Sequence, residues 1–88
     1  MSQDDILNCY TDLNRSAVSL YLNPHGQNHL IFLSHAIKIL KNNKYRNILL
    51  KIQKKLNSKL LIKEIPYLAD QILTTGILLK QKCYNQSL

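Results

Sequence analysis

Apolar residues recur every three or four positions in four successive segments of the chain, and this spacing limits the folds that the chain can adopt. In the first segment the recurring residues are Ile6, Leu7, Tyr10, Leu13, Ala17, Leu20 and Tyr21. A stripe with this period covers one face of an α-helix. No segment shows the sustained alternation of apolar and polar residues that is typical of a half-buried strand. The pattern therefore predicts an all-α protein.

Proline and asparagine mark where the four predicted helices begin and end. Asn23-Pro24 should end the first helix, because proline lacks an amide donor and pushes the preceding residue out of the helical region. Asn42-Asn43 is a turn signal between the second and third helices. Pro66 is tolerated only in a first turn, so the fourth helix should begin near Lys63. The expected helices cover residues 3–22, 28–41, 44–56 and 63–82, and we expect the residues from Lys82 onward to fray.

Short connectors between four amphipathic helices make neighbouring helices antiparallel. We therefore expect an antiparallel up-and-down four-helix bundle, with one domain over residues 1–88. The expected inward positions of the second helix are Leu30, Ile31, Leu33, Ile37 and Leu40, and those of the third are Tyr45, Ile48, Leu49, Ile52 and Leu56. Those of the fourth are Ile65, Leu68, Ala69, Ile72, Thr75 or Gly76, and Leu79. A glycine inside a helix costs about 1 kcal/mol relative to alanine. Gly76 should therefore mark a close approach of two helices or a kink.

The positive charge of the chain is concentrated in its middle. Between Asp12 and Glu64 there is no acidic residue, while ten Lys and Arg residues fall in the same stretch, and the formal net charge is +7. The third predicted helix has the clearest basic surface, formed by Arg46, Lys51, Lys54 and Lys55. Such a flank suits an anionic membrane, an acidic protein surface or a nucleic acid, although a plain solvated lysine face is the alternative.

The chain shows neither an export signal nor a membrane span. Its first five residues lack the basic and apolar regions of a secretory signal. The longest strictly apolar run is Leu30-Ile31-Phe32-Leu33, which is far shorter than the roughly 18 residues of a spanning helix. We expect a cytoplasmic protein that is soluble or peripheral at the inner face of the cell membrane.

Histidine and serine residues do not form a catalytic or metal-binding pattern. His25 and His29 are four apart, as in a metal-binding pair, but zinc needs a third or fourth ligand and the nearby chain offers none. Ser34 beside His35 lacks an orienting acid. We expect exposed or capping histidines, no metal, no cofactor and no catalytic residue, and therefore no enzyme.

The acidic residues near the amino terminus fit a helix start better than a catalytic carboxylate pair. Asp4 and Asp5 lie where negative charge is favoured by the helix dipole. Ser2 and Asp5 together resemble a capping box.

Cys9 and Cys83 are the only cysteines, and in a cytoplasmic chain we expect both to be reduced thiols. In an up-and-down bundle, however, the first helix starts at the end where the fourth helix finishes. The two cysteines could then lie near one another, so their pairing stays open.

A group of residues from Lys44 to Thr75 resembles a known family. Lys44-Tyr45 with Ile48-Leu49 resembles the start of that family's amphipathic helix, and Lys54-Lys55-Leu56-Asn57-Ser58 resembles its Lys-Lys-Leu-(Asp/Asn)-Ser exit. Ile65, Leu68, Ile72 and Thr75 fit the helix that follows. In this order the pieces resemble the pediocin-like, or class IIa, bacteriocin immunity proteins of lactic acid bacteria.

The resemblance implies a binding protein rather than an enzyme. Such a protein stays in the cytoplasm of the producer cell, associates there with the mannose phosphotransferase permease that has bound the bacteriocin, and blocks the resulting pore. A basic helical surface suits docking at a cytoplasmic membrane face. The candidate contact residues are Lys51, Lys54, Lys55, Lys59, Lys80 and Lys82.

The alternative interpretation is a small basic helical regulator associated with nucleic acid, which would use the same lysines. Arginine is scarce, and no helix-turn-helix with polar residues at a recognition-helix start is evident, which argues against sequence-specific reading of DNA. Tyr10, Tyr21, Tyr45 and Tyr67 fall on or next to apolar stripes, so we expect core-edge positions rather than stacking platforms for bases.

Overall fold

The computed structural model describes residues 2–41 and 44–87, with side chains described up to Lys82. These residues form four α-helices: α1 (Gln3–Leu22), α2 (Asn28–Ile39), α3 (Lys44–Leu56) and α4 (Ile65–Ser87). A short 3-10 turn, η1 (Ile62–Glu64), precedes α4. No strand occurs in the described part of the chain.

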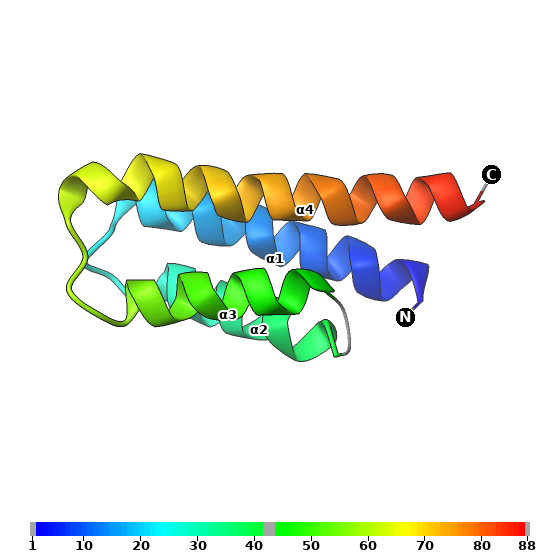
Figure 1. Cartoon of the computed structure of the whole chain (residues 1–88), viewed down its shortest axis with the longest axis horizontal. Coiled ribbons are helices and arrows are strands. Elements are labelled where there is room, and N and C mark those ends of the chain that lie inside the picture. Colours follow the sequence, from blue (N-terminus) through cyan, green and yellow to red (C-terminus); the bar gives the residue numbers. More distant parts are fainter. Residues whose placement is uncertain (1, 42–43, 88) are drawn as a thin grey trace.

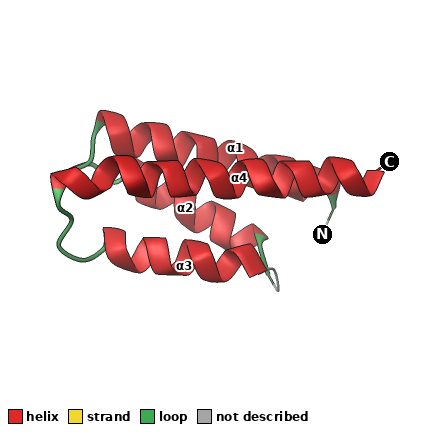
Figure 2. Ribbon diagram, turned by 45° about the horizontal axis from the view of Figure 1, so that its top comes forward, coloured by secondary structure: helices red, strands yellow, loops and turns green. Residues whose placement is uncertain are grey.

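The helices run alternately in opposite directions, so that α1 begins and α4 ends at the same end of the molecule (Figure 1). Each helix packs against two neighbours: α1 and α3 lie diagonally across the bundle, and both contact α2 and α4. The second view shows the same arrangement, with connectors only at the two ends (Figure 2). The molecule measures 41 × 20 × 17 Å. The expected antiparallel four-helix bundle is therefore confirmed.

The expected bounds of α1 and α3 are confirmed. At the start of α1, the Ser2 hydroxyl accepts a hydrogen bond from the Asp5 amide at 3.1 Å, as the capping pattern predicted. At the end of α3, the Ser58 amide and hydroxyl both donate to the Lys55 carbonyl, at 3.2 and 2.8 Å. The Asn57-Ser58 exit thus ends the helix by satisfying a carbonyl that would otherwise lack a partner.

Three helix bounds differ from the expectation. Helix α2 ends at Ile39 rather than at residue 41, because Leu40 leaves the helical region at φ −82° and ψ 83° while its side chain is fully buried. Asn42-Asn43, the expected turn, lies outside the described residues. Helix α4 continues to Ser87, so the expectation of a frayed tail from Lys82 is wrong. The sequence after Gly76 contains no proline or glycine to stop the helix. Helix α4 begins at Ile65 rather than at residue 63, because residues 62–64 form the turn η1. Pro66 lies in the first turn of α4, as expected.

A single core fills the space between the helices. Its buried apolar residues are Cys9, Leu13, Ala17, Leu20, Leu33, Ala36, Ile37, Leu40, Leu49, Ile52, Leu56, Ile65, Leu68, Ala69, Ile72 and Leu79. Every inward position expected in the fourth helix is buried. Tyr21, Ile31 and Ile48 are instead 53%, 50% and 41% exposed, so their inward assignment is wrong. A helix contacts its neighbours along a limited stripe, and apolar residues at the margins of that stripe remain in solvent.

Small residues set how closely the helices approach one another. Helix α3 contains no buried small residue. The other three helices contain Cys9, Ser16, Ala17, Ala36, Ala69, Thr75 and Gly76, all of which are buried. The closest packing accordingly joins α1 to α2 and α1 to α4. A methyl group at Gly76 would lie 3.4 Å from both Leu13 Cβ and Tyr10 Cδ2, so Gly76 marks a close helix approach, as expected.

Candidate functional site: a basic face and groove on α3

Helix α3 buries one side and presents lysines on the other. Its buried residues, Leu49, Ile52 and Leu56, are three or four apart, so they cover one side of the helix and leave the opposite side to polar side chains. Lys51, Lys54 and Lys55 are exposed on that surface, and Lys59 is exposed just beyond its end. These four lysines form the α3 basic face.

One lysine of the α3 basic face is already paired. Lys55 Nζ lies 3.0 Å from Glu64 Oε2, which ties the end of α3 to the turn η1. Because the Lys55 side chain is 45% exposed, this ion pair adds little stability. No described acid forms an ion pair with Lys51, Lys54 or Lys59. These three lysines therefore carry the uncompensated charge of the face.

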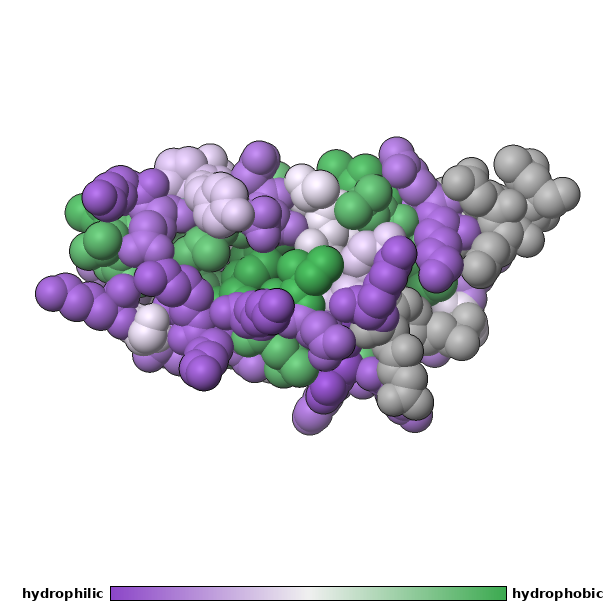
Figure 3. Space-filling model, in the orientation of Figure 1, coloured by the Kyte–Doolittle hydropathy of each residue, from purple (hydrophilic) through white to green (hydrophobic). Residues whose placement is uncertain are grey.

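A groove runs between α3 and α4, beside the α3 basic face. Its open cavity of about 370 Å³ is lined by Ile48, Lys51, Ile52, Lys55, Leu68 and Gln71. A neighbouring hollow of about 250 Å³ shares Ile48 and Gln71 and adds Tyr67, Asp70 and Leu78. Hydrophobic atoms lie between rows of hydrophilic ones on this face of the molecule (Figure 3). We name the two hollows together the α3–α4 groove.

The α3–α4 groove combines apolar contact with charge at its rim. Ile48 and Leu78, 41% and 42% exposed, offer apolar surface, while Lys51 and Lys55 project from the α3 side. Protein-binding sites commonly have an apolar centre and a polar rim. Sequence analysis missed the groove because it assigned Ile48 to the core. The pair Ile48-Leu49 could have revealed it, since adjacent residues on a helix cannot both point at the same neighbour.

The antiparallel order separates the six predicted contact lysines into two groups. Helices α3 and α4 finish at opposite ends of the bundle (Figure 1). Lys51, Lys54, Lys55 and Lys59 belong to the second half of α3 and the connector after it, whereas Lys80 and Lys82 belong to the second half of α4. Lys80 Nζ lies 4.6 Å from the centre of the Tyr10 ring on α1, a cation–π contact. Lys82 is exposed. A partner on the α3 basic face would therefore not touch Lys80 and Lys82 at the same time unless it spanned the long axis of the bundle.

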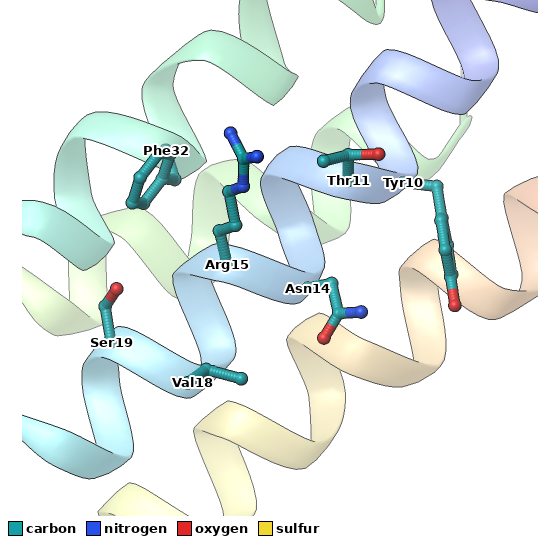
Figure 4. A pocket seen from close by; sticks show the side chains of 7 residues that line it. All are labelled: Tyr10, Thr11, Asn14, Arg15, Val18, Ser19 and Phe32. Atoms are coloured by element: carbon teal, nitrogen blue, oxygen red, sulfur yellow. The ribbon is translucent and has the colours of Figure 1, made fainter.

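A second surface pocket lies along α1, beside Phe32 of α2. Its volume is about 380 Å³, and it is lined by α1 residues together with Phe32 of α2 (Figure 4). The Arg15 guanidinium carbon lies 5.9 Å from the centre of the Phe32 ring. The next hollow along the same helices contains Asp12 and His35. Burial raises the pKa of the Asp12 carboxyl, an effect that the positive charges of His35 and Arg15 oppose.

Ser34 and His35 do not come together as a nucleophile and a base. The Ser34 hydroxyl accepts a hydrogen bond from Gln53 Nε2 of α3 at 3.1 Å, whereas His35 lines the hollow that faces α1. The adjacent residues thus face different helices. The arrangement suits side-chain packing and charge balance at the surface.

His25 and His29 do not form a pair. His25 is exposed in the connector before α2, and His29 is only 3% exposed in the first turn of α2, so the expectation of an exposed or capping residue is wrong for His29. The Ser16 hydroxyl donates to the His29 carbonyl at 2.8 Å, which holds α1 against α2. Burial lowers the pKa of His29. No three His, Cys, Asp or Glu residues of the described chain lie close enough together to hold a metal ion.

Cys9 is an interior thiol. It is fully buried, and its Sγ donates to the Ala36 carbonyl at 3.7 Å. Burial, together with the negative charge of Asp12, raises the pKa of Cys9 to about 12, so the thiol stays protonated. The Cys83 side chain lies outside the described residues, so the pairing of the two cysteines stays an open question.

Comparisons with family models, curated proteins and solved structures find no match for this chain. Within the described residues, no helix has both the length and the apolar character needed to cross a membrane.

Proposed function

We propose that the chain is a bacteriocin immunity protein that protects its producer cell from a pediocin-like bacteriocin. It acts from the cytoplasmic side by binding the mannose phosphotransferase permease that has bound the bacteriocin, and it blocks the pore. The observation that carries the proposal is the α3–α4 groove beside the uncompensated lysines of α3. The resemblance from Lys44 to Thr75 covers the same two helices.

The groove supports a binding role in physical terms. Its apolar centre can contact hydrophobic side chains of a partner, while Lys51, Lys54 and Lys59 can attract acidic groups around them. Asp70 on the α4 side gives the groove one acidic wall opposite the basic one. This unequal charge favours one orientation of a bound segment over the reverse. The proposed mechanism is occupancy of the partner, with no chemical step.

The proposal is tested by expressing the chain inside a strain that is sensitive to pediocin-like bacteriocins. The expressing cells and cells with an empty vector are challenged with a panel of these peptides, and survival is counted. We expect protection against at least one member. A pore-forming peptide of another class serves as the control and should kill both strains equally. Unchanged killing by every pediocin-like peptide would refute the assignment.

A gel shift distinguishes the alternative role as a nucleic-acid-associated regulator. Phosphate contacts by lysines give binding that is strong at low salt and weakens steeply as salt rises. We expect only such weak, sequence-independent binding at low salt. Tight binding that persists at about 0.15 M salt, without protection of cells, would favour the regulator instead.

A further inference from the structure

A group of large apolar side chains is exposed at one end of the bundle. Leu22 is the last residue of α1 and is 80% exposed, and Ile62 in η1 is 77% exposed. They are accompanied by Tyr21, Leu61 and Tyr67, which are 53%, 43% and 66% exposed. We name these five residues the apolar tip. Scattered exposed apolar residues are ordinary, but several at one end of a small protein mark a contact surface.

The topology brings the apolar tip together from distant parts of the sequence. Because α1 and α4 are antiparallel neighbours, the last turn of α1 lies at the end where η1 and the first turn of α4 begin. Both views place the two connectors at this end, away from the start of α1 (Figures 1 and 2). Hydrophobic atoms gather at the same end in the space-filling view, next to hydrophilic side chains (Figure 3).

Charge around the apolar tip is positive. Lys54, Lys59 and Lys63 are exposed there, and no described acid forms an ion pair with any of them. Glu64 is neutralised by Lys55, which leaves Asp70 as the other acid among residues 54–70. The acids of the first turn of α1, Asp4 and Asp5, lie at the opposite end of the bundle. The tip is thus an apolar surface bordered by lysines.

We propose that the apolar tip inserts into the surface of an anionic lipid bilayer. Leucine and isoleucine would enter the boundary between headgroups and acyl chains, tyrosine would lie at headgroup level, and Lys54, Lys59 and Lys63 would contact lipid phosphates. A second copy of the chain fits this surface less well, because end-to-end pairing would bring the same lysines together. With the tip inserted, the α3–α4 groove stays on the side of the bundle and remains accessible.

The absence of tryptophan from the chain allows a direct test of insertion. Ile62→Trp places one fluorophore in the tip, and Ile77→Trp places one at an exposed site on α4, more than two turns away from the tip. The proteins are mixed with vesicles of phosphatidylglycerol and phosphatidylcholine or of phosphatidylcholine alone. We expect a blue shift for Ile62→Trp with the anionic vesicles only, and none for Ile77→Trp. Equal shifts in both variants, or no shift in either, would overturn the proposal.

Paired charge variants separate local contact from general attraction. Lys59→Gln with Lys63→Gln removes charge at the tip, and Lys38→Gln with Lys41→Gln removes the same charge at the other end of the bundle. Sedimentation with anionic vesicles at low salt should weaken at least about tenfold for the tip pair, since each lysine near an anionic surface is worth about fivefold. The control pair should lose much less. Equal losses would show that net charge alone, not the tip, drives binding.

Removal of the apolar groups tests the other half of the proposal. Leu22→Ser with Ile62→Ser should reduce vesicle binding about tenfold, because inserted apolar area contributes to interfacial affinity. Both side chains are exposed, so the fold should persist, and circular dichroism checks this. Unchanged vesicle binding by this double variant would contradict the proposal. The proposal would also be contradicted if the original protein did not bind vesicles but formed a dimer in sedimentation, and if the double variant disrupted that dimer. These assays need neither bacteriocin nor permease, so their failure is distinct from failure of the proposed immunity function.

Discussion

The seam between α1 and α2 contains three polar or weakly polar groups that are buried: Cys9, Ser16 and His29. Ser16 satisfies its hydroxyl on the His29 carbonyl, but His29 Nδ1 is buried and has no hydrogen-bond partner among the described residues. A neutral imidazole tolerates this position better than a charged one. The stability of the protein should therefore respond to the protonation of a single histidine.

The first prediction concerns that pH dependence. Burial lowers the pKa of His29 below its ordinary value of 6.5, so the unfolded chain binds a proton more readily than the folded protein. The free energy of unfolding is therefore not reduced by His29 above about pH 6.5, and it falls as the pH drops below this value. In urea unfolding between pH 8 and pH 5.5, His29→Leu should reduce the loss of unfolding free energy on acidification.

The matched control for this prediction is His25→Gln, which changes an exposed histidine in the connector. It should keep the pH dependence of the original protein. The pKa of Asp12 is also raised, but Asp12 is present in the original protein and in both variants. Its effect on the pH dependence of stability is therefore the same in all three and cancels in the comparison. Parallel pH profiles for His29→Leu and the original protein would show that His29 does not control the response.

The second prediction concerns Gly76, where α4 approaches α1. A methyl group there would just contact Leu13 and Tyr10 at 3.4 Å, so Gly76→Ala should keep the packing and gain helix propensity. We expect the free energy of unfolding to rise by up to about 1 kcal/mol. Gly76→Leu should instead lower it by about 2 kcal/mol, because larger groups overfill a packed interface. Thermal and urea unfolding measure both, and a marked loss for alanine would contradict this account of the interface.

The residues that sequence analysis missed lie on stripes that were visible in the chain. His29 precedes Leu33, Ala36 and Ile37 at helical spacing, and Cys9 precedes Leu13 and Ser16 in the same way. For His29 the residue type favoured an exposed position, whereas its position on the stripe favoured burial. His29 is buried because α1 and α2 approach each other closely through small side chains, and this close packing also buries the larger side chains beside them.

At the scale of elements, α3 differs from the other helices in how it is attached. It carries no small residue, and its buried residues are Leu49, Ile52 and Leu56. Gln53 donates a side-chain hydrogen bond to Ser34 of α2. Helix α1 approaches both of its neighbours closely, whereas α3 lies farther from α2 and α4. The helix that carries the basic face is therefore the one held by the fewest core contacts.

The third prediction follows from that attachment. In native-state hydrogen exchange, the amides of α3 should exchange faster than those of the middle of α1, because local opening costs less where fewer apolar contacts break. Peptides covering residues 44–56 and 6–20, analysed by mass spectrometry, provide the comparison. Equal protection in the two segments would show that the bundle opens only as a unit.

Helix bounds were largely predictable because their signals are local. Ser2, Asn23-Pro24 and Pro66 act through the backbone of their own turn. The end of α2 was not predictable in this way, since Leu40 leaves the helix where its side chain becomes buried among the other helices. The length of α4 was underestimated because the residues from Lys82 onward were expected to fray, although nothing in that segment breaks a helix.

At the scale of the whole molecule, the alternating direction of the helices decides which charges lie together. Lys59 and Lys80 both belong to the carboxyl-terminal half of the sequence, but the bundle places them toward opposite ends of a molecule that is 41 Å long. The α3–α4 groove and the apolar tip also arise from assembly, because each is lined by residues from separate helices. Periodicity along one helix cannot show such surfaces.

The central claim is that the α3 basic face, rather than net charge, carries the binding function, and cell protection by two charge-matched variants tests it most directly. Lys51→Glu with Lys54→Glu changes that face, and Lys38→Glu with Lys41→Glu makes the same change in charge at the end of α2, with all four side chains exposed. Both variants should unfold at urea concentrations close to that of the original protein. We predict that the α3 variant loses protection against the pediocin-like bacteriocin while the α2 variant keeps it. Equal protection by both variants, or equal loss, would contradict the account.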